Sequence, residues 1–319
     1  MKRVLIILML AFLSLGAFAR GLDELVPRPD SILVQKGSFR VSGAAMRCDP
    51  GFEKPAIEAV KRFASRISLV CGKSCPFSSP VGLASVVNDG SVKGVVFLKD
   101  ASLAAGAYRI DVASKSCVVR ASDCEGVSNA LATLKQLLPE EVYGIGNGSD
   151  KKWVIPACVI KDAPENVRRG LCVDCAAEYR TVEELKSLFG EMSKYKINTV
   201  SLVLSAKKCW RVKGQAGSDL AKVSAYFEGG EKIYDAEQLK DLAKTALSLG
   251  LSIEPCLVVP SELLAYLNLD KLPSDAVSEV EELLGASVKF AGDASEFGVD
   301  IDNVDIKSLA QTLWGGKGE

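Results

Sequence analysis

The second half of the chain alternates short apolar runs with longer amphipathic stretches. Continuous apolar runs are typical of strands buried on both faces, and four such strands are predicted, at residues 170–176, 199–205, 252–259 and 288–294. Apolar residues at helical spacing predict the helices that follow them, at residues 181–195, 235–249, 276–284 and 304–313. Strands that alternate with helices in this way predict a parallel sheet covered by helices, wound in one hand like a TIM-type (β/α) barrel.

The first half of the chain has a different pattern, that of a small α+β layer. Strands are predicted at 31–41 and 94–98, and a hairpin at 108–112 and 117–121. Amphipathic helices are predicted at 57–69 and 123–138. The sequence therefore predicts an α/β fold, with a small α+β N-terminal domain at 20–163 and a partial (half) barrel of about four strand–helix units at 164–319.

Residues 1–19 have the pattern of a cleavable signal peptide. Lys2 and Arg3 precede an apolar run at 4–18 that is too short to span a membrane comfortably, and Ala17-Phe18-Ala19 forms a small-x-small cleavage signal. We therefore expect the mature chain to begin near Arg20, in a bacterial periplasm or outside the cell, with a non-cleaved anchor as the alternative. No later segment is long and apolar enough for a membrane span.

Composition narrows the set of partners and cofactors. With 39 basic and 40 acidic residues the charges nearly cancel, so nucleic acids and acidic polymers are not the expected partners. The chain has ten cysteines and no histidine. Export would permit disulfides, but the spacing leaves their pairing open. Cys172 and Cys175 match CxxC, yet residues three apart in a strand point to opposite faces, so we expect small buried residues there. Without histidine or a second CxxC, neither a metal nor another cofactor is predicted.

Several motifs occur in order along the chain. Residues 289–294, at the fourth predicted strand, are Lys-Phe-Ala-Gly-Asp-Ala, and residues 167–174 are Val-Arg-Arg-Gly-Leu-Cys-Val-Asp. They resemble the motifs His-x-Gly-Gly-Asp-Glu and Trp-Arg-Gly-x-x-x-Asp of glycoside hydrolase family 20, the β-N-acetylhexosaminidases. Residues 106–110 and 126–137 are similar to the small domain that precedes the barrel in that family. The resemblance covers essentially the whole mature chain. It implies that Arg169 binds hydroxyls of the terminal sugar and that Asp293 steadies the sugar's acetamido group, and Asp174 also matches.

The departures from the family pattern fall on polar positions of the pocket. Ala294 stands where the family has its general-acid glutamate. Further histidines and acids of the family are replaced on the second and third strands, at Ser201, Val203, Ala206, Lys207, Cys256, Val258 and Glu262. The residues that are kept belong to the scaffold, namely Asn198, Leu204, Trp210, Arg211, Pro255, Pro260 and Gly292.

These losses bear on the chemistry that the resemblance implies. In substrate-assisted hydrolysis the acetamido oxygen of the sugar attacks its own anomeric carbon, and the glutamate protonates the leaving oxygen. Alanine has no proton to give, so no catalytic pair is intact. Glu296, Asp174 and Glu178 would be displaced substitutes for the missing acid.

We therefore expect an inactive family member, a pseudoenzyme of carbohydrate metabolism, that binds an N-acetylhexosamine-containing glycan or a protein partner. Its contacts to the sugar would be Arg169, Asp174 and Asp293, although Arg169 paired with one of these two carboxylates would be purely structural. Two alternatives stay open: an active hydrolase that a second chain completes, and a truncated gene product without a selected function. A half barrel has open edges, so a homodimer or a second chain is expected to close it.

Overall fold

The computed structural model of the protein describes residues 21–88, 91–144, 148–149, 152–297 and 305–315. The predicted signal peptide, residues 1–19, lies outside these residues. The chain divides into two compact units: unit 1 is Met1–Val167 with Trp314–Glu319, and unit 2 is Arg168–Leu313. The sequence places the boundary slightly earlier, between residues 163 and 164, and assigns Trp314 to the second domain.

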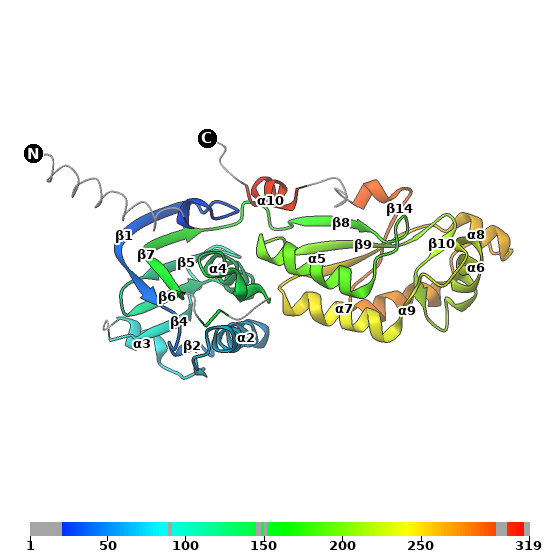
Figure 1. Ribbon diagram of the computed structural model, residues 1–319. Helices are drawn as coiled ribbons and strands as arrows, with labels where there is room; N and C mark the ends of the chain where they lie inside the picture. Colours follow the sequence, from blue (N-terminus) through cyan, green and yellow to red (C-terminus); the bar gives the residue numbers. More distant parts are fainter. Residues whose placement is uncertain (1–20, 89–90, 145–147, 150–151, 298–304, 316–319) are drawn as a thin grey trace, which may run out of the picture. The chain divides into compact units, whose positions relative to one another are not determined.

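A mixed seven-stranded sheet forms the middle of unit 1 (Figure 1). Its strand order is β1-β7-β5-β6-β4-β2-β3. β5 and β6 pair antiparallel with Ile110 opposite Val119, which confirms the predicted hairpin. β7 was not predicted and lies between β1 and β5. The strands are β1 (Ser31–Arg40), β2 (Met46–Cys48), β3 (Phe77–Ser78), β4 (Gly94–Lys99), β5 (Tyr108–Val112), β6 (Ser116–Ala121) and β7 (Val154–Asp162).

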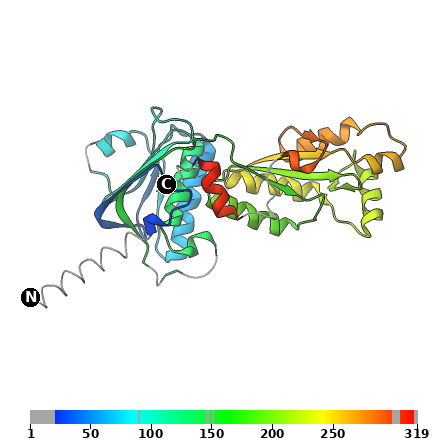
Figure 2. The same cartoon turned by 90° about the horizontal axis from the view of Figure 1, so that it is seen from above.

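Two long helices, α2 and α4, lie side by side in the core of unit 1 (Figures 1 and 2). Both were predicted, and the Asp123 side chain begins α4 by accepting a hydrogen bond from the Gly126 N–H at 2.8 Å. Successive residues of β4 face opposite sides, so Val95 joins the core with α2 and α4, whereas Val96 packs in a small cluster with the start of α3. The helical segments are α2 (Lys54–Cys71), α3 (Leu83–Asn88), α4 (Cys124–Gln136) and the short 3-10 turn η1 (Glu140–Tyr143).

Unit 2 is a partial (β/α) barrel. Its sheet has four parallel strands in the order β8-β9-β13-β14, which is also their order in the sequence, and the short β10 pairs antiparallel with the end of β9. Strands that follow one another in sequence and in space are joined as they are in a barrel. The strands of unit 2 are β8 (Gly170–Asp174), β9 (Thr199–Ala206), β10 (Cys209–Trp210), β11 (Val212–Lys213), β12 (Tyr234–Asp235), β13 (Ser252–Val258) and β14 (Lys289–Ala291).

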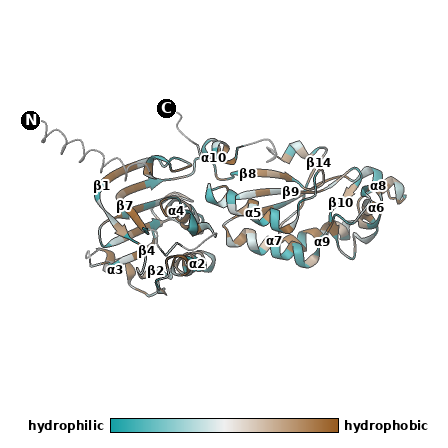
Figure 3. Ribbon diagram, viewed as in Figure 1, coloured by the Kyte–Doolittle hydropathy of each residue, from teal (hydrophilic) through white to brown (hydrophobic). Residues whose placement is uncertain are grey.

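The helices of unit 2 bury their apolar residues against one face of this sheet. α5 and α7 begin with capping boxes at Thr181 and Asp235, where the sequence pattern predicts their starts. In Figure 3 both apolar and polar residues follow one another along these two helices, whereas β8 and β9 beside them are mostly apolar. The helical segments are α5 (Val182–Lys194), α6 (Ser218–Glu228), α7 (Ala236–Ser248), α8 (Ser261–Tyr266), α9 (Ser274–Leu284), the 3-10 turn η2 (Ala294–Phe297) and α10 (Ile306–Trp314).

Unit 2 also differs from the predictions at its fourth strand and in two of its helices. The strand predicted at 288–294 ends at Ala291, and Ala294 instead begins η2. α6 and α8 were not predicted. They follow Gly217 and Pro260, and neither helix begins with a capping side chain that could be recognised in the sequence.

The cysteines are all free thiols in the structure. Cys172 and Cys175 are both buried and lie in different clusters on the two sides of the sheet, as the predicted strand geometry requires. Within the ranges that the structure describes, no helix has both the length and the apolar character needed to cross a membrane.

Candidate functional site

The carboxyl ends of the parallel strands of unit 2 surround a cavity of about 440 Å³. In parallel α/β folds this end of the sheet is where ligands bind. The cavity brings together three of the residues that the sequence analysis singled out, Asp174, Asp293 and Ala294. Most positions at which the family's polar residues are replaced also line it, namely Val203, Ala206, Lys207, Val258 and Glu262.

The floor of the cavity, by which we mean the cluster of side chains on the inner face of the sheet next to it, is apolar. Phe297 of η2 is 9% exposed and packs with Cys172, Val203 and Cys256 on the inner face of the sheet. η2 thus lies against this face, and the Cys172 thiol lies 3.9 Å from the Ala294 carbonyl oxygen. Burial raises the pKa of Cys256 to about 12, so its thiol stays protonated. The floor therefore supplies packing and no acid–base group.

Four carboxylates line the cavity, and three of them are engaged by other groups of the protein. Glu228 forms an ion pair with the buried guanidinium of Arg211. Glu262 lies 3.3 Å from the Lys208 amino group. Asp174 accepts hydrogen bonds from the main-chain N–H groups of Ala176 and Ala177, at 3.0 and 2.9 Å. None of the three is the isolated carboxyl in an apolar setting that serves as a proton donor at neutral pH.

The fourth carboxylate, Asp293, is exposed. It accepts the Ser295 N–H at 2.9 Å, and hydrogen bonds from Ser295 lower the pKa of the carboxyl, so it is ionised. Its neighbour Ala294 offers only a methyl group. Glu296 is not aimed into the cavity as a substitute acid, because its carboxylate accepts the N–H groups of Gly292 and Asp293 at 3.0 and 3.1 Å.

Arg169 is not among the residues that line this cavity. Its side chain is 1% exposed, and its Nε donates to the Lys196 carbonyl at 2.9 Å. It precedes β8, at the end of the strand opposite to Asp174. The structure therefore does not bring Arg169 together with Asp174 and Asp293, and a contact to a sugar in this cavity is not available to it. The neighbouring Arg168, to which the motif assigns no role, faces the inner side of the sheet instead.

An ion cluster that was not predicted from the sequence lies on that inner face. Arg168 Nη2 is 2.6 Å from a carboxylate oxygen of Glu254, and Lys289 Nζ is 2.7 Å from the other oxygen. Ser201, between them on β9, contacts Arg168 and Glu254 at 2.9 and 3.1 Å. The sequence signal is a charged residue inside an otherwise apolar strand, because an unpaired buried charge is costly.

The retained pair Trp210 and Arg211 has a structural role. The Arg211 side chain is buried and donates to the carbonyls of Cys175, Ala176 and Lys232 at 2.6, 2.9 and 2.9 Å. These bonds attach the segment after β9 to the end of β8, beside the cavity. Arg211 therefore shapes the cavity wall without entering the cavity.

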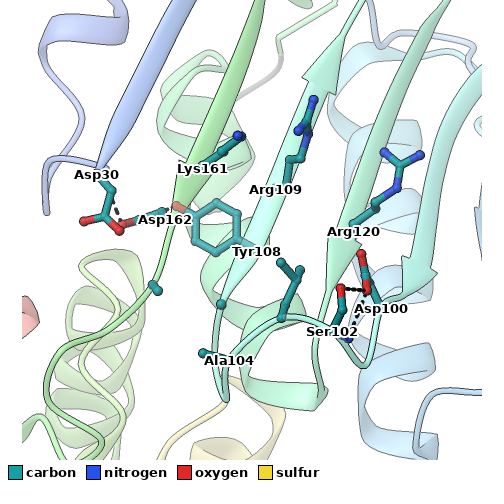
Figure 4. A pocket seen from close by; sticks show the side chains of 12 residues that line it. Asp30, Asp100, Ser102, Ala104, Tyr108, Arg109, Arg120, Lys161 and Asp162 are labelled. Atoms are coloured by element: carbon teal, nitrogen blue, oxygen red, sulfur yellow. Dashed lines mark hydrogen bonds between the residues drawn. The ribbon is translucent and has the colours of Figure 1, made fainter.

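A second cavity, of about 670 Å³, lies in unit 1 (Figure 4). Arg109, Arg120 and Lys161 lie opposite one another on neighbouring strands along it. The two arginines share Asp111, at 2.7 and 3.1 Å. Two of the three cations along the larger cavity are thus engaged by Asp111, and the strand-end cavity remains the candidate site. In the described ranges, no group of three or more histidine, cysteine or acidic residues could hold a metal ion.

Comparison with known proteins supports the family resemblance of both units. The chain matches the family models "Glycosyl hydrolase family 20, domain 2" over residues 23–163 and "Glycosyl hydrolase family 20, catalytic domain" over residues 168–284. The second match ends before Asp293, so the assignment of Asp293 and Ala294 rests on their motif and on their position at the cavity.

Relatives and solved structures agree with these models. A beta-N-acetylhexosaminidase of Cellulomonas fimi is 29% identical over 200 residues, 60% of this chain and 39% of that protein. A beta-hexosaminidase of Vibrio furnissii is 25% identical over 213 residues, 62% of this chain and 33% of that protein. The chain thus spans about two fifths or less of the length of these relatives.

The fold is similar to that of the Streptomyces plicatus N-acetyl-beta-hexosaminidase, with a TM-score of 0.64, 23% identity and coverage of 74% of this chain and 46% of that one. For the Flavobacterium johnsoniae chitobiase the TM-score is 0.65, the identity 20% and the coverage 85% and 45%. These matches confirm the resemblance that the motifs predict and the partial barrel.

Proposed function

Because the chain belongs to glycoside hydrolase family 20, we propose that its strand-end cavity binds the terminal N-acetylhexosamine of a glycan without hydrolysing it. The observation that carries this proposal is Ala294, a methyl group at the cavity wall where the family resemblance calls for the general acid. General acid catalysis contributes roughly 10²- to 10⁴-fold to a rate, and an alkoxide leaving group depends on it. A cavity without this acid can still bind a sugar.

The other carboxylates of the cavity do not take over this role. Glu228, Glu262 and Asp174 are each engaged by a cation or by main-chain N–H groups. A carboxyl held by such partners is not free to approach a leaving oxygen, whereas a general acid must lie within hydrogen-bonding reach of it.

The cavity does offer groups that suit a sugar. A volume of about 440 Å³ is in the range of small-molecule sites. Asp174 and Asp293 provide oxygens that accept hydrogen bonds from hydroxyl or amide groups, and Lys207 provides a donor. Acceptors and a donor around a partly apolar wall match a neutral, amphipathic pyranose.

Turnover of a chromogenic N-acetylglucosaminide separates this proposal from the alternative of an active hydrolase. We expect the purified protein to release no more aglycone than Asp293→Asn, which keeps the shape of the side chain and removes its charge. Release that clearly exceeds the background, and that this substitution abolishes, would overturn the inactive assignment.

Calorimetry with N-acetylglucosamine tests the binding half of the proposal. Asp174→Ala and Asp293→Ala should each weaken binding, by about tenfold for the loss of a charged hydrogen-bonding partner. Asp219→Ala is the matched control, since Asp219 is exposed on α6, pairs with Lys222 and does not line the cavity. Equal affinity of all three variants would contradict the assignment of the cavity.

Export is a further part of the proposal. It is supported by the basic start, the apolar run and the small residues before Arg20. Cell fractionation with mass spectrometry of the mature N-terminus tests it, and a protein that keeps residues 1–19 in the cytosol would contradict it.

Closure of the partial barrel by a homodimer or a second chain stays a prediction, which light scattering of the purified protein checks.

A further inference from the structure

Three exposed aromatic residues of unit 2 contact one another. Tyr226 and Phe227 lie at the end of α6, and Tyr266 lies at the end of α8. Their exposed fractions are 75%, 41% and 60%. The Phe227 ring lies 5.7 Å from that of Tyr226 and 5.8 Å from that of Tyr266, both edge to face. We refer to Tyr226, Phe227 and Tyr266 as the aromatic platform.

The aromatic platform is continuous with the strand-end cavity. Glu228 lines the cavity and directly follows Phe227. Glu262 also lines the cavity, and Tyr266 follows it four residues later on α8. Residues four apart on a helix lie on the same face, about 5–6 Å from each other, so the platform begins one helical turn from the cavity. Both helices therefore connect a cavity wall to an exposed aromatic ring.

The chemistry of the aromatic platform fits a saccharide better than an apolar partner. Tyrosine combines an apolar ring with a polar tip. In the described part of the chain, the hydroxyls of Tyr226 and Tyr266 make no hydrogen bond, so both are available to a ligand. A pyranose has a face of C–H groups, which packs on an aromatic ring, and a rim of hydroxyls. Contiguous exposed aromatic rings beside a cavity commonly mark an interaction site.

We propose that the aromatic platform carries the sugar residues that follow the terminal one, so that the site binds an oligosaccharide and not a single sugar. This inference rests on the proposed function, because the terminal residue has to occupy the strand-end cavity. The ligand class is a neutral oligosaccharide with an N-acetylhexosamine at its end, which extends from the cavity across α8 and the end of α6.

Calorimetry with N-acetylglucosamine and its β-1,4-linked dimer, trimer and tetramer tests the inference. With the full-length protein we expect the affinity to rise roughly three- to tenfold from the monomer to the trimer, which is the gain that aromatic packing of this kind gives. Tyr266→Ala and Phe227→Ala should remove this gain and leave monomer binding unchanged. Tyr143→Ala, at an exposed tyrosine of unit 1, is the matched control and should keep the gain.

The possible outcomes distinguish a failure of this inference from a failure of the proposed function. Monomer binding without a gain for longer chains, or a gain that survives both platform variants, overturns the platform and leaves the cavity assignment standing. No binding of any length overturns both. Thermal unfolding of each variant shows whether it keeps the fold, which is expected because neither side chain belongs to the buried core.

Discussion

Arg168 Nη2 lies 2.6 Å from a carboxylate oxygen of Glu254, which joins the segment before β8 to β13 across the strand between them. The second carboxylate oxygen of Glu254 takes Lys289 from β14 at 2.7 Å. One carboxylate therefore links the segment before β8 with β13 and β14 on the inner face of the partial barrel. The Glu254 side chain is 20% exposed, whereas the cations are 45% and 50% exposed.

The first prediction concerns Glu254 and pH. Burial acts to raise the pKa of this carboxyl, but the hydrogen bonds and charges of Arg168 and Lys289 outweigh it and hold the pKa at about 2, below the ordinary 4.5. A lowered pKa stabilises the folded state above pH 4.5, and this contribution disappears as the pH falls toward 2. We expect Glu254→Gln to lower the free energy of unfolding at pH 7 by about 1–2 kcal/mol, since solvent screens the half-exposed cations.

Urea unfolding of both proteins between pH 7 and pH 3 measures this effect. The difference between wild type and Glu254→Gln should shrink as the pH falls. Glu191→Gln, in an exposed pair with Lys194 on α5, should change the stability little at any pH. A difference that stays constant with pH would mean that the charge of Glu254 does not contribute.

The contrast between Arg168 and Arg169 shows where prediction from the sequence reaches its limit. Adjacent residues of an extended chain point to opposite sides. An assignment that is shifted by one residue therefore exchanges the arginine that faces the inner side of the sheet for the arginine that is buried. The motif alone assigns Arg169 to the sugar. The local backbone before β8 turns Arg168 inward and holds Arg169 against the Lys196 carbonyl.

Other features were accessible because their signals are local. The starts of α5 and α7 follow from Thr181 and Asp235, whose side chains cap the helices. Asp293 and Ala294 lie at the cavity, as their motif predicts. The aromatic platform could not be found, because it depends on contacts between α6 and α8, two helices without capping side chains at their starts.

The second prediction concerns Arg211. Its side chain is 2% exposed and bonds to Glu228 and to three main-chain carbonyls. Arg211→Met should lower the free energy of unfolding by about 2–4 kcal/mol, because it leaves the partly buried Glu228 carboxylate and these carbonyls without their partner. Arg211→Lys should not restore the stability, since an ammonium group cannot reach all of these acceptors at once.

Urea titrations monitored by circular dichroism check the effect of Arg211. Lys213→Ala is the control, because Lys213 forms an exposed pair with Glu231 and should cost less than about 1 kcal/mol. Similar losses for Arg211→Met and Lys213→Ala would show that Arg211 does not hold the wall of the cavity.

The third prediction concerns Asp162, a buried carboxylate of unit 1. It accepts hydrogen bonds from the Tyr108 hydroxyl at 2.7 Å and from the Trp314 indole N–H at 2.9 Å. Asp162→Ala should lower the free energy of unfolding by about 2–4 kcal/mol, because the buried indole donor loses its acceptor. Tyr108→Phe should cost only about 1 kcal/mol, since its ring still fills the core.

The fluorescence of Trp314 and Trp153 during urea unfolding would report these losses. The order of the two variants is the critical result. If Tyr108→Phe cost as much as Asp162→Ala, then the hydroxyl would be the essential member of the network, and not the carboxylate that it shares with Trp314.

The last prediction concerns Phe297, which covers thiols on the inner face of the sheet. Phe297 packs with Cys172 and Cys256, and burial raises the pKa of Cys256 to about 12. A protonated and covered thiol reacts slowly, because only the thiolate is nucleophilic. Phe297→Ala should speed the alkylation of both cysteines by roughly tenfold, since a loss of about 1.4 kcal/mol in local packing makes opening ten times more frequent.

Alkylation by iodoacetamide, followed by peptide mass spectrometry, assigns the rate to each cysteine. Phe227→Ala removes an exposed ring from the same unit and should leave these rates unchanged. Cys175, which is fully buried in the main core of unit 2, is the internal control for unfolding of this unit. If Cys175 accelerates together with Cys172 and Cys256, the whole unit is opening and η2 is not a separate cover. If only the latter two accelerate, then η2 closes the inner face of the sheet, and the same turn that places Ala294 at the cavity wall also seals its floor.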